Sequence, residues 1–197
     1  MTEPDDLILA SASPARFALL TAAGLSVRVQ PADIDEDAVK TVIDNPITLA
    51  LRLASEKALA VSRLNPDALV IGADQVLAFE GEVFSKAEDL QTLRRHLTRL
   101  RGRTHELISA AALAKGGTVL WQGEDRASLT MRSFSDTFMD DYIIREGTQV
   151  LSSVGGYHLE GRGIHLFDTV KGHTSTVLGL PLLALLAALR NLGSLAT

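Results

Sequence analysis

The segment from Leu7 to Arg16 has the residue types and order of an anion-binding site. Its apolar start predicts a short buried strand, and Ser13 followed by Pro14 predicts the beginning of a helix. Serine caps first-turn amides, and proline at the first helical position has no N–H to satisfy. The amides left free point outward with the positive end of the helix dipole, and Arg16 adds a fixed positive charge. The pattern indicates an anion site, but it also fits a capped helix without a ligand.

Asp74 is an acidic residue inside an otherwise apolar strand. It follows the apolar run 69–73 and precedes the apolar run 76–79. An ionised carboxylate in such a strand costs several kcal/mol unless it meets a cation, a metal or good donors. We therefore expect Asp74 to have a partner. The alternative is a bulge at Gly72 that turns the carboxylate toward solvent.

Lys57 lies in the apolar stripe of a helix predicted over 46–63. The stripe consists of Ala50, Leu53, Ala54, Val61 and Leu64. A lysine that simply faced water would occupy the opposite face. One interpretation is a phosphate ligand at the mouth of a cleft, with Glu56 beside it holding the lysine in place. The other is snorkelling, in which the stem packs and the ammonium reaches water.

Acidic residues gather between the first two predicted helices. They are Asp33, Asp35, Glu36 and Asp37. Alone, such a cluster is typical of a solvated loop. Beside phosphate-binding groups, one or two of these carboxylates would suit Mg²⁺, which shares its oxygen ligands between protein, water and phosphates. Lys86 precedes another predicted helix and is either a second ammonium for the same anion or an exposed lysine.

Composition sets the class of protein. At 197 residues and 46% hydrophobic, the chain is long enough for one core, so a single domain is expected over 1–197. The absence of cysteine excludes disulfides, thiolate metal sites and cysteine nucleophiles. A net charge of −5 without a basic run argues against nucleic-acid binding.

Residues 1–6 do not resemble a signal peptide, and 177–192 is too short to span a membrane. A cytoplasmic protein without a membrane partner is expected.

Alternating strand and helix patterns predict an α/β fold. Strands are predicted at Leu7–Ala10, Ala68–Phe79, His105–Ala114, Thr118–Met131 and Ile164–Val170. Helices are predicted at Pro14–Ala23, Pro46–Arg63, Ala87–Leu100, Asp136–Glu146 and Val177–Leu192. Gly116-Gly117 between two strands predicts a hairpin, so the sheet should be mixed. The glycine-rich stretch 152–163 is the expected functional loop.

Several segments occur together in a specific order along almost the whole chain. They are Ser11-Ala12-Ser13-Pro14-Ala15-Arg16, Asp33-Ile34-Asp35-Glu36, Glu56-Lys57-Ala58, Gly72-Ala73-Asp74-Gln75-Val76, Lys86, Gly155-Gly156-Tyr157, Glu160-Gly161 and Gly179-Leu180-Pro181-Leu182. This series resembles the Maf family of nucleotide pyrophosphatases. The resemblance implies an elongated mixed β-sheet flanked by helices, related to the inosine triphosphate pyrophosphatases and often forming a homodimer. It also implies a divalent metal, Mg²⁺ or Mn²⁺, and hydrolysis of a nucleoside triphosphate between its α and β phosphates.

The same resemblance assigns roles to residues. Asp74 matches the proton acceptor that activates water for attack on the α phosphorus. Glu36, together with Asp74, matches a metal ligand. The positions expected to bind substrate or clamp its phosphates are Ser11, Ser13, Arg16, Glu56, Lys57 and Lys86. Their charges would stabilise the leaving pyrophosphate.

Three positions bear on the nucleobase: Ala15, Gln75 and Glu160. Members with arginine, threonine and glutamine there look like dTTP and UTP enzymes. Gln75 and Glu160 resemble the branch acting on 7-methyl-GTP, although that branch has a tryptophan where Ala15 stands, so an aromatic stacking partner is missing. The Glu160 carboxylate could accept from the N1 and N2 donors of guanine. We expect a purine or modified guanine nucleotide rather than a canonical pyrimidine.

Two other classes of function compete with hydrolysis. The family is also linked with inhibition of septum formation, so a nucleotide-sensing regulator is one alternative. Retention of the matched catalytic positions favours turnover. A folded domain whose charges only solvate its surface is disfavoured by the placements of Lys57 and Asp74.

Overall fold

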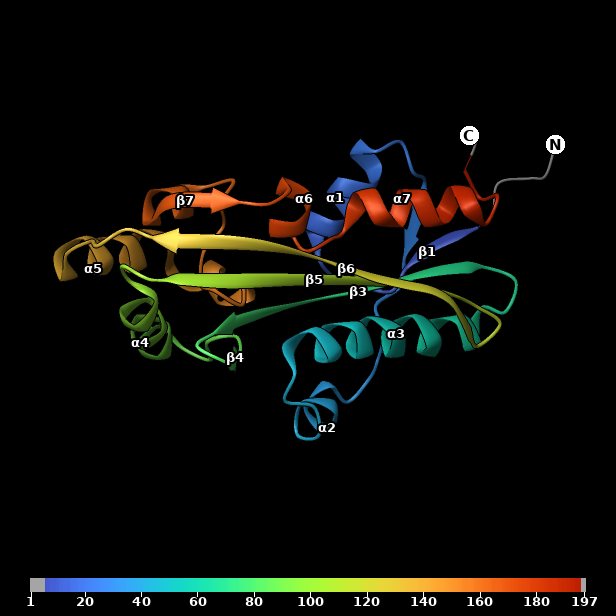
Figure 1. The fold of residues 1–197 in the computed structure, drawn as a ribbon, viewed down its shortest axis with the longest axis horizontal. Coiled ribbons are helices and arrows are strands. Elements are labelled where there is room, and N and C mark those ends of the chain that lie inside the picture. Colours follow the sequence, from blue (N-terminus) through green and yellow to red (C-terminus); the bar gives the residue numbers. More distant parts are fainter. Residues whose placement is uncertain (1–5, 196–197) are drawn as a thin grey trace. The chain divides into compact units, whose positions relative to one another are not determined.

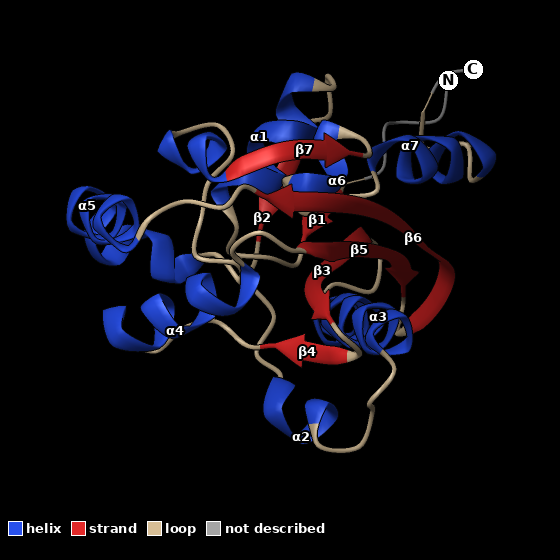
Figure 2. Cartoon of the chain, turned by 60° about the vertical axis from the view of Figure 1, so that its left-hand side comes forward, coloured by secondary structure: helices blue, strands red, loops and turns tan. Residues whose placement is uncertain are grey.

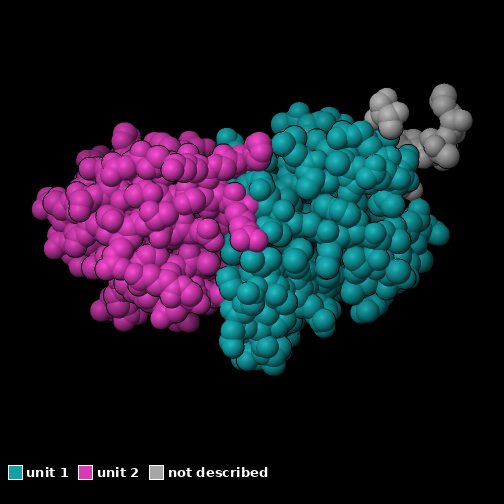
Figure 3. Space-filling view, viewed as in Figure 1, with its two compact units in different colours: residues 1–75, 108–125, 174–197 teal, residues 76–107, 126–173 magenta. Residues whose placement is uncertain are grey.

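The computed structural model describes residues 6–195, which form two compact units (Figure 3). Unit 1 takes its described residues from 6–75, 108–125 and 174–195, and unit 2 consists of 76–107 and 126–173. Three strands contribute residues to both units. The division therefore does not by itself mark independent domains, and a single domain over 1–197 stays a prediction.

Unit 1 is a sheet with helices on both faces (Figures 1 and 2). Its strands are β1 (Leu7–Leu9), β2 (Val27–Val29) and parts of β3 (Leu69–Phe79), β5 (Thr104–Lys115) and β6 (Thr118–Met131), in the order β2-β1-β3-β5-β6. Its helices are α1 (Pro14–Ala22), α2 (Glu36–Lys40), α3 (Pro46–Leu64), α6 (Thr174–Val177) and α7 (Leu182–Asn191). Strand β1 runs parallel to both β2 and β3.

Unit 2 combines the remaining parts of the long strands with short elements. These are β4 (Glu82–Phe84), α4 (Leu90–Leu100), α5 (Asp136–Glu146), the 3-10 helices η1 (Gly147–Ser152) and η2 (Arg162–Leu166), and β7 (Phe167–Lys171). Strand β4 is antiparallel to β3, and β7 is antiparallel to β6. Parallel and antiparallel pairs both occur, so the predicted mixed α/β sheet flanked by helices is confirmed.

The predicted hairpin at Gly116-Gly117 is also confirmed. The two glycines join the neighbouring strands β5 and β6 and have φ angles of +57° and +76°. Tight hairpins favour turns with positive φ at both central residues, a conformation that glycine adopts without steric cost.

The side chains of β3 alternate between two different environments, as expected for a strand. Leu69, Ile71 and Ala73 join the core of unit 1 with residues of α1 and α7. On the other face, Gly72 lies against α3, where an added Cβ would be 2.1 Å from the carbonyl oxygen of Ala54. Glycine at this position therefore allows the backbones of β3 and α3 to approach closely.

Some predicted boundaries are wrong for identifiable reasons. Helix α4 begins at Leu90 rather than Ala87, because the Asp89 carboxylate accepts the Thr92 amide and caps the helix there. Strand β7 begins at Phe167 rather than Ile164, because 162–166 forms the 3-10 helix η2.

The predicted terminal helix over 177–192 is present as α7 (Leu182–Asn191), which begins five residues later than predicted. Helix α6 ends at Val177 and α7 begins at Leu182. Between them, Gly179 has a φ of +99° and Pro181 has a ψ of 66°. Neither backbone conformation belongs to an α-helix.

Several short elements were not predicted, among them β2, β4 and α2. Strands β2 and β4 have three residues each and helix α2 has five. Segments this short have too few residues for a hydrophobic period to show. Within residues 6–195, no helix is long and apolar enough to cross a membrane.

Replacing Gly72 with alanine should destabilise the protein by about 3 kcal/mol, because the new methyl group overlaps the backbone of α3. Chemical denaturation monitored by circular dichroism measures this. In the control Gly161→Ala, the nearest atom to the new Cβ is 3.7 Å away, so the loss should stay within about 0.5 kcal/mol. Equal stability of the two variants would contradict the proposed close approach.

Candidate active site

The centre of the site is an ion pair between α3 and β3. Lys57 Nζ lies 2.6 Å from Asp74 Oδ1, and the two side chains are 11% and 10% exposed. The expected partner of Asp74 is confirmed, and the alternative of a bulge exposing it is wrong. Snorkelling of Lys57 to water is also wrong, since its ammonium turns to the buried carboxylate.

Helix α2 brings a second carboxylate to the same ammonium. Glu36 Oε1 lies 2.8 Å from Lys57 Nζ. Asp35 caps α2 by accepting the Ala38 amide at 2.9 Å, and this cap places Glu36 in the first helical turn. Of the acidic cluster, Glu36 is therefore the residue that joins Lys57 and Asp74.

Arg16, in the first turn of α1, lies near Asp74 and Glu36. Ser13 Oγ accepts the Arg16 amide at 3.4 Å, so the predicted N-cap is confirmed. The Arg16 guanidinium donates to Ser11 Oγ at 2.9 Å and to the carbonyl oxygens of Ala73 at 3.1 Å and Gly179 at 2.9 Å. Its position is thus fixed from three sides.

Arg16 is also electrostatically linked to the two carboxylates. Burial lowers the pKa of its guanidinium, while the negative charges of Asp74 and Glu36 act in the opposite direction. Two cations and two carboxylates thus share one part of unit 1. Such a group can receive an anion on its positive members and a proton or metal on its negative ones, as the expected chemistry requires.

Gln75 belongs to the face of β3 opposite Asp74. Its Nε2 contacts Ser109 Oγ at 3.1 Å and the carbonyl oxygens of Thr176 and Val177, each at 3.0 Å. These carbonyls end α6, where the helix itself offers no donors. Gln75 therefore fixes the segment leading to Gly179, the carbonyl partner of Arg16, and its role in specificity stays a prediction. The sequence motif contained these residues but did not indicate this network.

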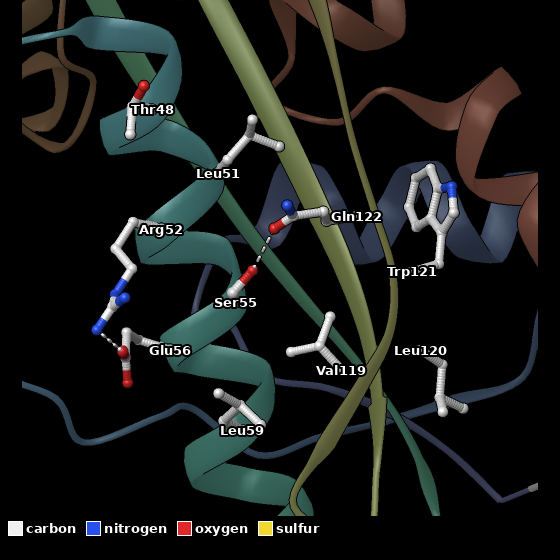
Figure 4. Close-up of a pocket in the computed structure, with 10 residues that line it drawn as sticks. All are labelled: Thr48, Leu51, Arg52, Ser55, Glu56, Leu59, Val119, Leu120, Trp121 and Gln122. Atoms are coloured by element: carbon white, nitrogen blue, oxygen red, sulfur yellow. Dashed lines mark hydrogen bonds and ion pairs between the residues drawn. The ribbon is translucent and has the colours of Figure 1, made fainter.

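Glu56 does not hold Lys57, contrary to expectation. It pairs with Arg52 at 2.7 Å, because successive residues of a helix point in different directions. Both residues line a groove of about 620 Å³ between α3 and β6 (Figure 4). The remaining lining residues are Thr48, Leu51, Ser55, Leu59, Val119, Leu120, Trp121 and Gln122. A substrate-binding role for Glu56 stays a prediction.

No contact with the Lys57–Asp74 pair is described for the three remaining predicted site residues. Ala15 is in the first turn of α1, next to Arg16. Lys86 and Glu160 are exposed residues of unit 2, in the loops before α4 and before η2. Their roles stay predictions.

The loop that carries Glu160 is anchored within unit 2. Tyr157 Oη lies 2.6 Å from His105 Nε2, and Tyr142 donates to the carbonyl oxygen of Gly156 at 3.0 Å. Gly156 has a φ of +69°, and an added Cβ would meet Leu93 at 2.0 Å. The glycines in this stretch predicted a loop, but its buried aromatic and imidazole contacts were missed.

The donor set around Lys57 fits one mode of metal binding. Among residues 6–195 there is no group of three or more acidic or histidine side chains suited to hold a metal ion. Glu36 and Asp74 nevertheless each direct a carboxylate oxygen to the same ammonium, that of Lys57. Mg²⁺ is often bound by one or two carboxylates, with water and substrate phosphates completing its shell.

Comparison with known proteins places the chain in a family. The sequence profile of the Maf-like protein family matches residues 6–192, and the chain belongs to this family. A 7-methyl-GTP pyrophosphatase of Mesorhizobium japonicum is 47% identical over 99% of this chain and 99% of its own length. A nucleoside triphosphate pyrophosphatase of Granulibacter bethesdensis is 46% identical over 94% of this chain and 96% of its own.

A solved structure is similar over part of the chain. It is a nucleoside-triphosphatase, or dITP/XTP pyrophosphatase, of Mycobacterium abscessus, with a TM-score of 0.41 and 18% identity over 66% of this chain and 75% of that chain. This partial likeness supports no inference about the site.

The buried imidazole of unit 2 should make stability depend on pH. Burial lowers the pKa of His105 from its usual 6.5 to about 4. The unfolded chain therefore takes up a proton first as the pH falls from 6.5. Stability contributed by neutral His105 is complete above pH 6.5 and is lost toward pH 4, by up to about 3 kcal/mol.

His105→Gln removes this titration, so the free energy of unfolding of the variant should fall less than that of the wild type between pH 6.5 and 4. Urea denaturation over that range measures the difference. The exposed His173 provides the control, since His173→Gln should keep the wild-type profile. Parallel profiles for wild type and His105→Gln would contradict the prediction.

Proposed function

We propose that this protein hydrolyses a nucleoside triphosphate to a nucleoside monophosphate and pyrophosphate. The observation that carries the proposal is the buried Lys57–Asp74 pair, with Glu36 and Arg16 beside it. This arrangement offers a carboxylate to activate water and cations to bind phosphates. Full-length relatives named as pyrophosphatases support the same activity.

In the proposed reaction, Asp74 accepts a proton from a water molecule whose oxygen bonds to the α phosphorus. The bond from the α phosphorus to the bridging oxygen of the β phosphate breaks, and pyrophosphate leaves. Arg16 and Lys57 bind the phosphate oxygens, together with the free amides at the start of α1. Positioning and charge neutralisation supply most of the rate enhancement, as in phosphoryl transfer.

A divalent cation, Mg²⁺ or Mn²⁺, completes the proposed site. Glu36 and Asp74 would hold it, and when bound it would neutralise charge on the phosphate oxygens. The carboxylate donors of this chain suit such hard ions.

For the substrate, we propose a purine or modified guanine nucleotide, and 7-methyl-GTP as the specific candidate. The relative from Mesorhizobium japonicum carries that name, and Glu160 supplies a carboxylate suited to the N1 and N2 donors of guanine. A homodimer, a cytoplasmic location and the lack of nucleic-acid and membrane partners stay predictions.

Asp74→Asn should lower the rate of pyrophosphate release by about 100- to 10,000-fold, because the amide cannot accept the proton from water. The assay uses canonical and modified triphosphates with Mg²⁺ or Mn²⁺. Asp67→Asn is a matched control, since Asp67 is exposed just before β3. Full activity of Asp74→Asn would exclude Asp74 as the base, and tight nucleotide binding without any hydrolysis by the wild type would favour the nucleotide-sensing regulator.

Glu160→Gln should lower kcat/KM for 7-methyl-GTP by about tenfold relative to UTP, because a charge-assisted hydrogen bond to the base is lost. Competition between the two substrates measures this ratio directly. The exposed Glu106→Gln variant controls for a general change of charge in unit 2. An unchanged ratio would remove Glu160 from base recognition.

A further inference from the structure

The Lys57 ammonium bridges the two carboxylates that would hold a divalent cation. Its nitrogen lies within 2.8 Å of Glu36 Oε1 and 2.6 Å of Asp74 Oδ1, the two carboxylates available for a divalent cation. The same contact occupies an oxygen of the residue that must accept a proton from water. In this arrangement, Lys57 occupies one oxygen of each carboxylate.

We propose that Lys57 is an exchangeable internal cation: it neutralises Glu36 and Asp74 in the nucleotide-free protein and moves to the phosphates when a nucleotide binds. This inference rests on the proposed function. It makes divalent metal binding dependent on the nucleotide, and it uncovers the Asp74 carboxylate only when substrate is present.

The charges of the site favour this exchange. Without nucleotide, Lys57 and Arg16 balance Glu36 and Asp74, while Lys40 pairs with both Glu36 and Asp37. A divalent cation entering alone would meet an ammonium already between its ligands and a guanidinium nearby, and the repulsion is strong in a partly buried site. A triphosphate brings the negative charge that attracts Lys57 away and compensates the metal.

The two cations differ in their freedom to move. Arg16 is tied to Ser11, Ala73 and Gly179 by hydrogen bonds, so it stays in place. Lys57 makes its ion pairs through a compact ammonium at the end of a flexible four-carbon chain, which can turn to new acceptors. Lys57 is therefore the member of the cluster able to exchange partners.

The test measures Mn²⁺ binding by electron paramagnetic resonance on the full chain. Without nucleotide, Lys57→Met should bind Mn²⁺ about tenfold more tightly than the wild type, because the competing ammonium is gone. With a non-hydrolysable α,β-methylene nucleotide, the wild type should gain much more Mn²⁺ affinity than Lys57→Met does. Unchanged Mn²⁺ affinity of Lys57→Met in the absence of nucleotide would overturn the inference.

Lys40→Met is the matched control. Lys40 Nζ is 3.6 Å from Glu36 Oε2 and 3.1 Å from Asp37 Oδ1, so the variant removes the same charge beside Glu36 but not from between the two carboxylates. Its Mn²⁺ affinity should stay near the wild-type value. If Lys40→Met raised the Mn²⁺ affinity as much as Lys57→Met, the effect would come from the loss of any positive charge near Glu36. That result would overturn the inference that Lys57 exchanges partners.

A second measurement needs no substitution, in case Lys57→Met does not fold. A crystal structure of the wild type with Mn²⁺ and the analogue should show Lys57 on a phosphate oxygen, away from Asp74. Lys57 still bound to both carboxylates beside Mn²⁺ would overturn the inference. Pyrophosphate release by the wild type separates the two hypotheses: hydrolysis without the Mn²⁺ effects refutes only the exchange, whereas the Mn²⁺ effects without hydrolysis refute only the proposed function.

Discussion

The ion pair between Lys57 and Asp74 is the interaction on which the site depends. Both side chains are largely buried, and a buried charge that loses its partner typically costs about 3–5 kcal/mol. Each of the two charges therefore needs an opposite charge in this interior, and each supplies it to the other. The absence of a side chain at Gly72 brings α3 close enough to β3 for the pair to form.

The opposite face of β3 serves the same site in a different way. Gln75 and Ser109 donate to the carbonyls that end α6, and the segment after α6 offers the Gly179 carbonyl to Arg16. Arg16 in turn reaches back to the carbonyl of Ala73 in β3. One strand thus organises a buried ion pair on one face and helps to fix Arg16 through the other.

Much of this arrangement could be predicted from local patterns. Helices α1, α3 and α5 begin where they are predicted, at Pro14, Pro46 and Asp136, and the side chains of Ser13, Asn45 and Ser135 cap them. The need of Asp74 for a partner followed from the cost of burying a charge in an apolar strand. The partner of Lys57 was assigned wrongly, to the adjacent Glu56, because sequence proximity does not show that successive helical residues point apart.

Residue type and local periodicity are enough to predict that a carboxylate and an ammonium lie in apolar elements and that a capped helix start carries an arginine. The contacts of Glu36 with Lys57 and of Gly179 with Arg16 appear only in the folded chain. Both contacts join segments that lie far apart in the sequence. Such contacts are set by the packing of helices on the sheet, which leaves no local period in the sequence.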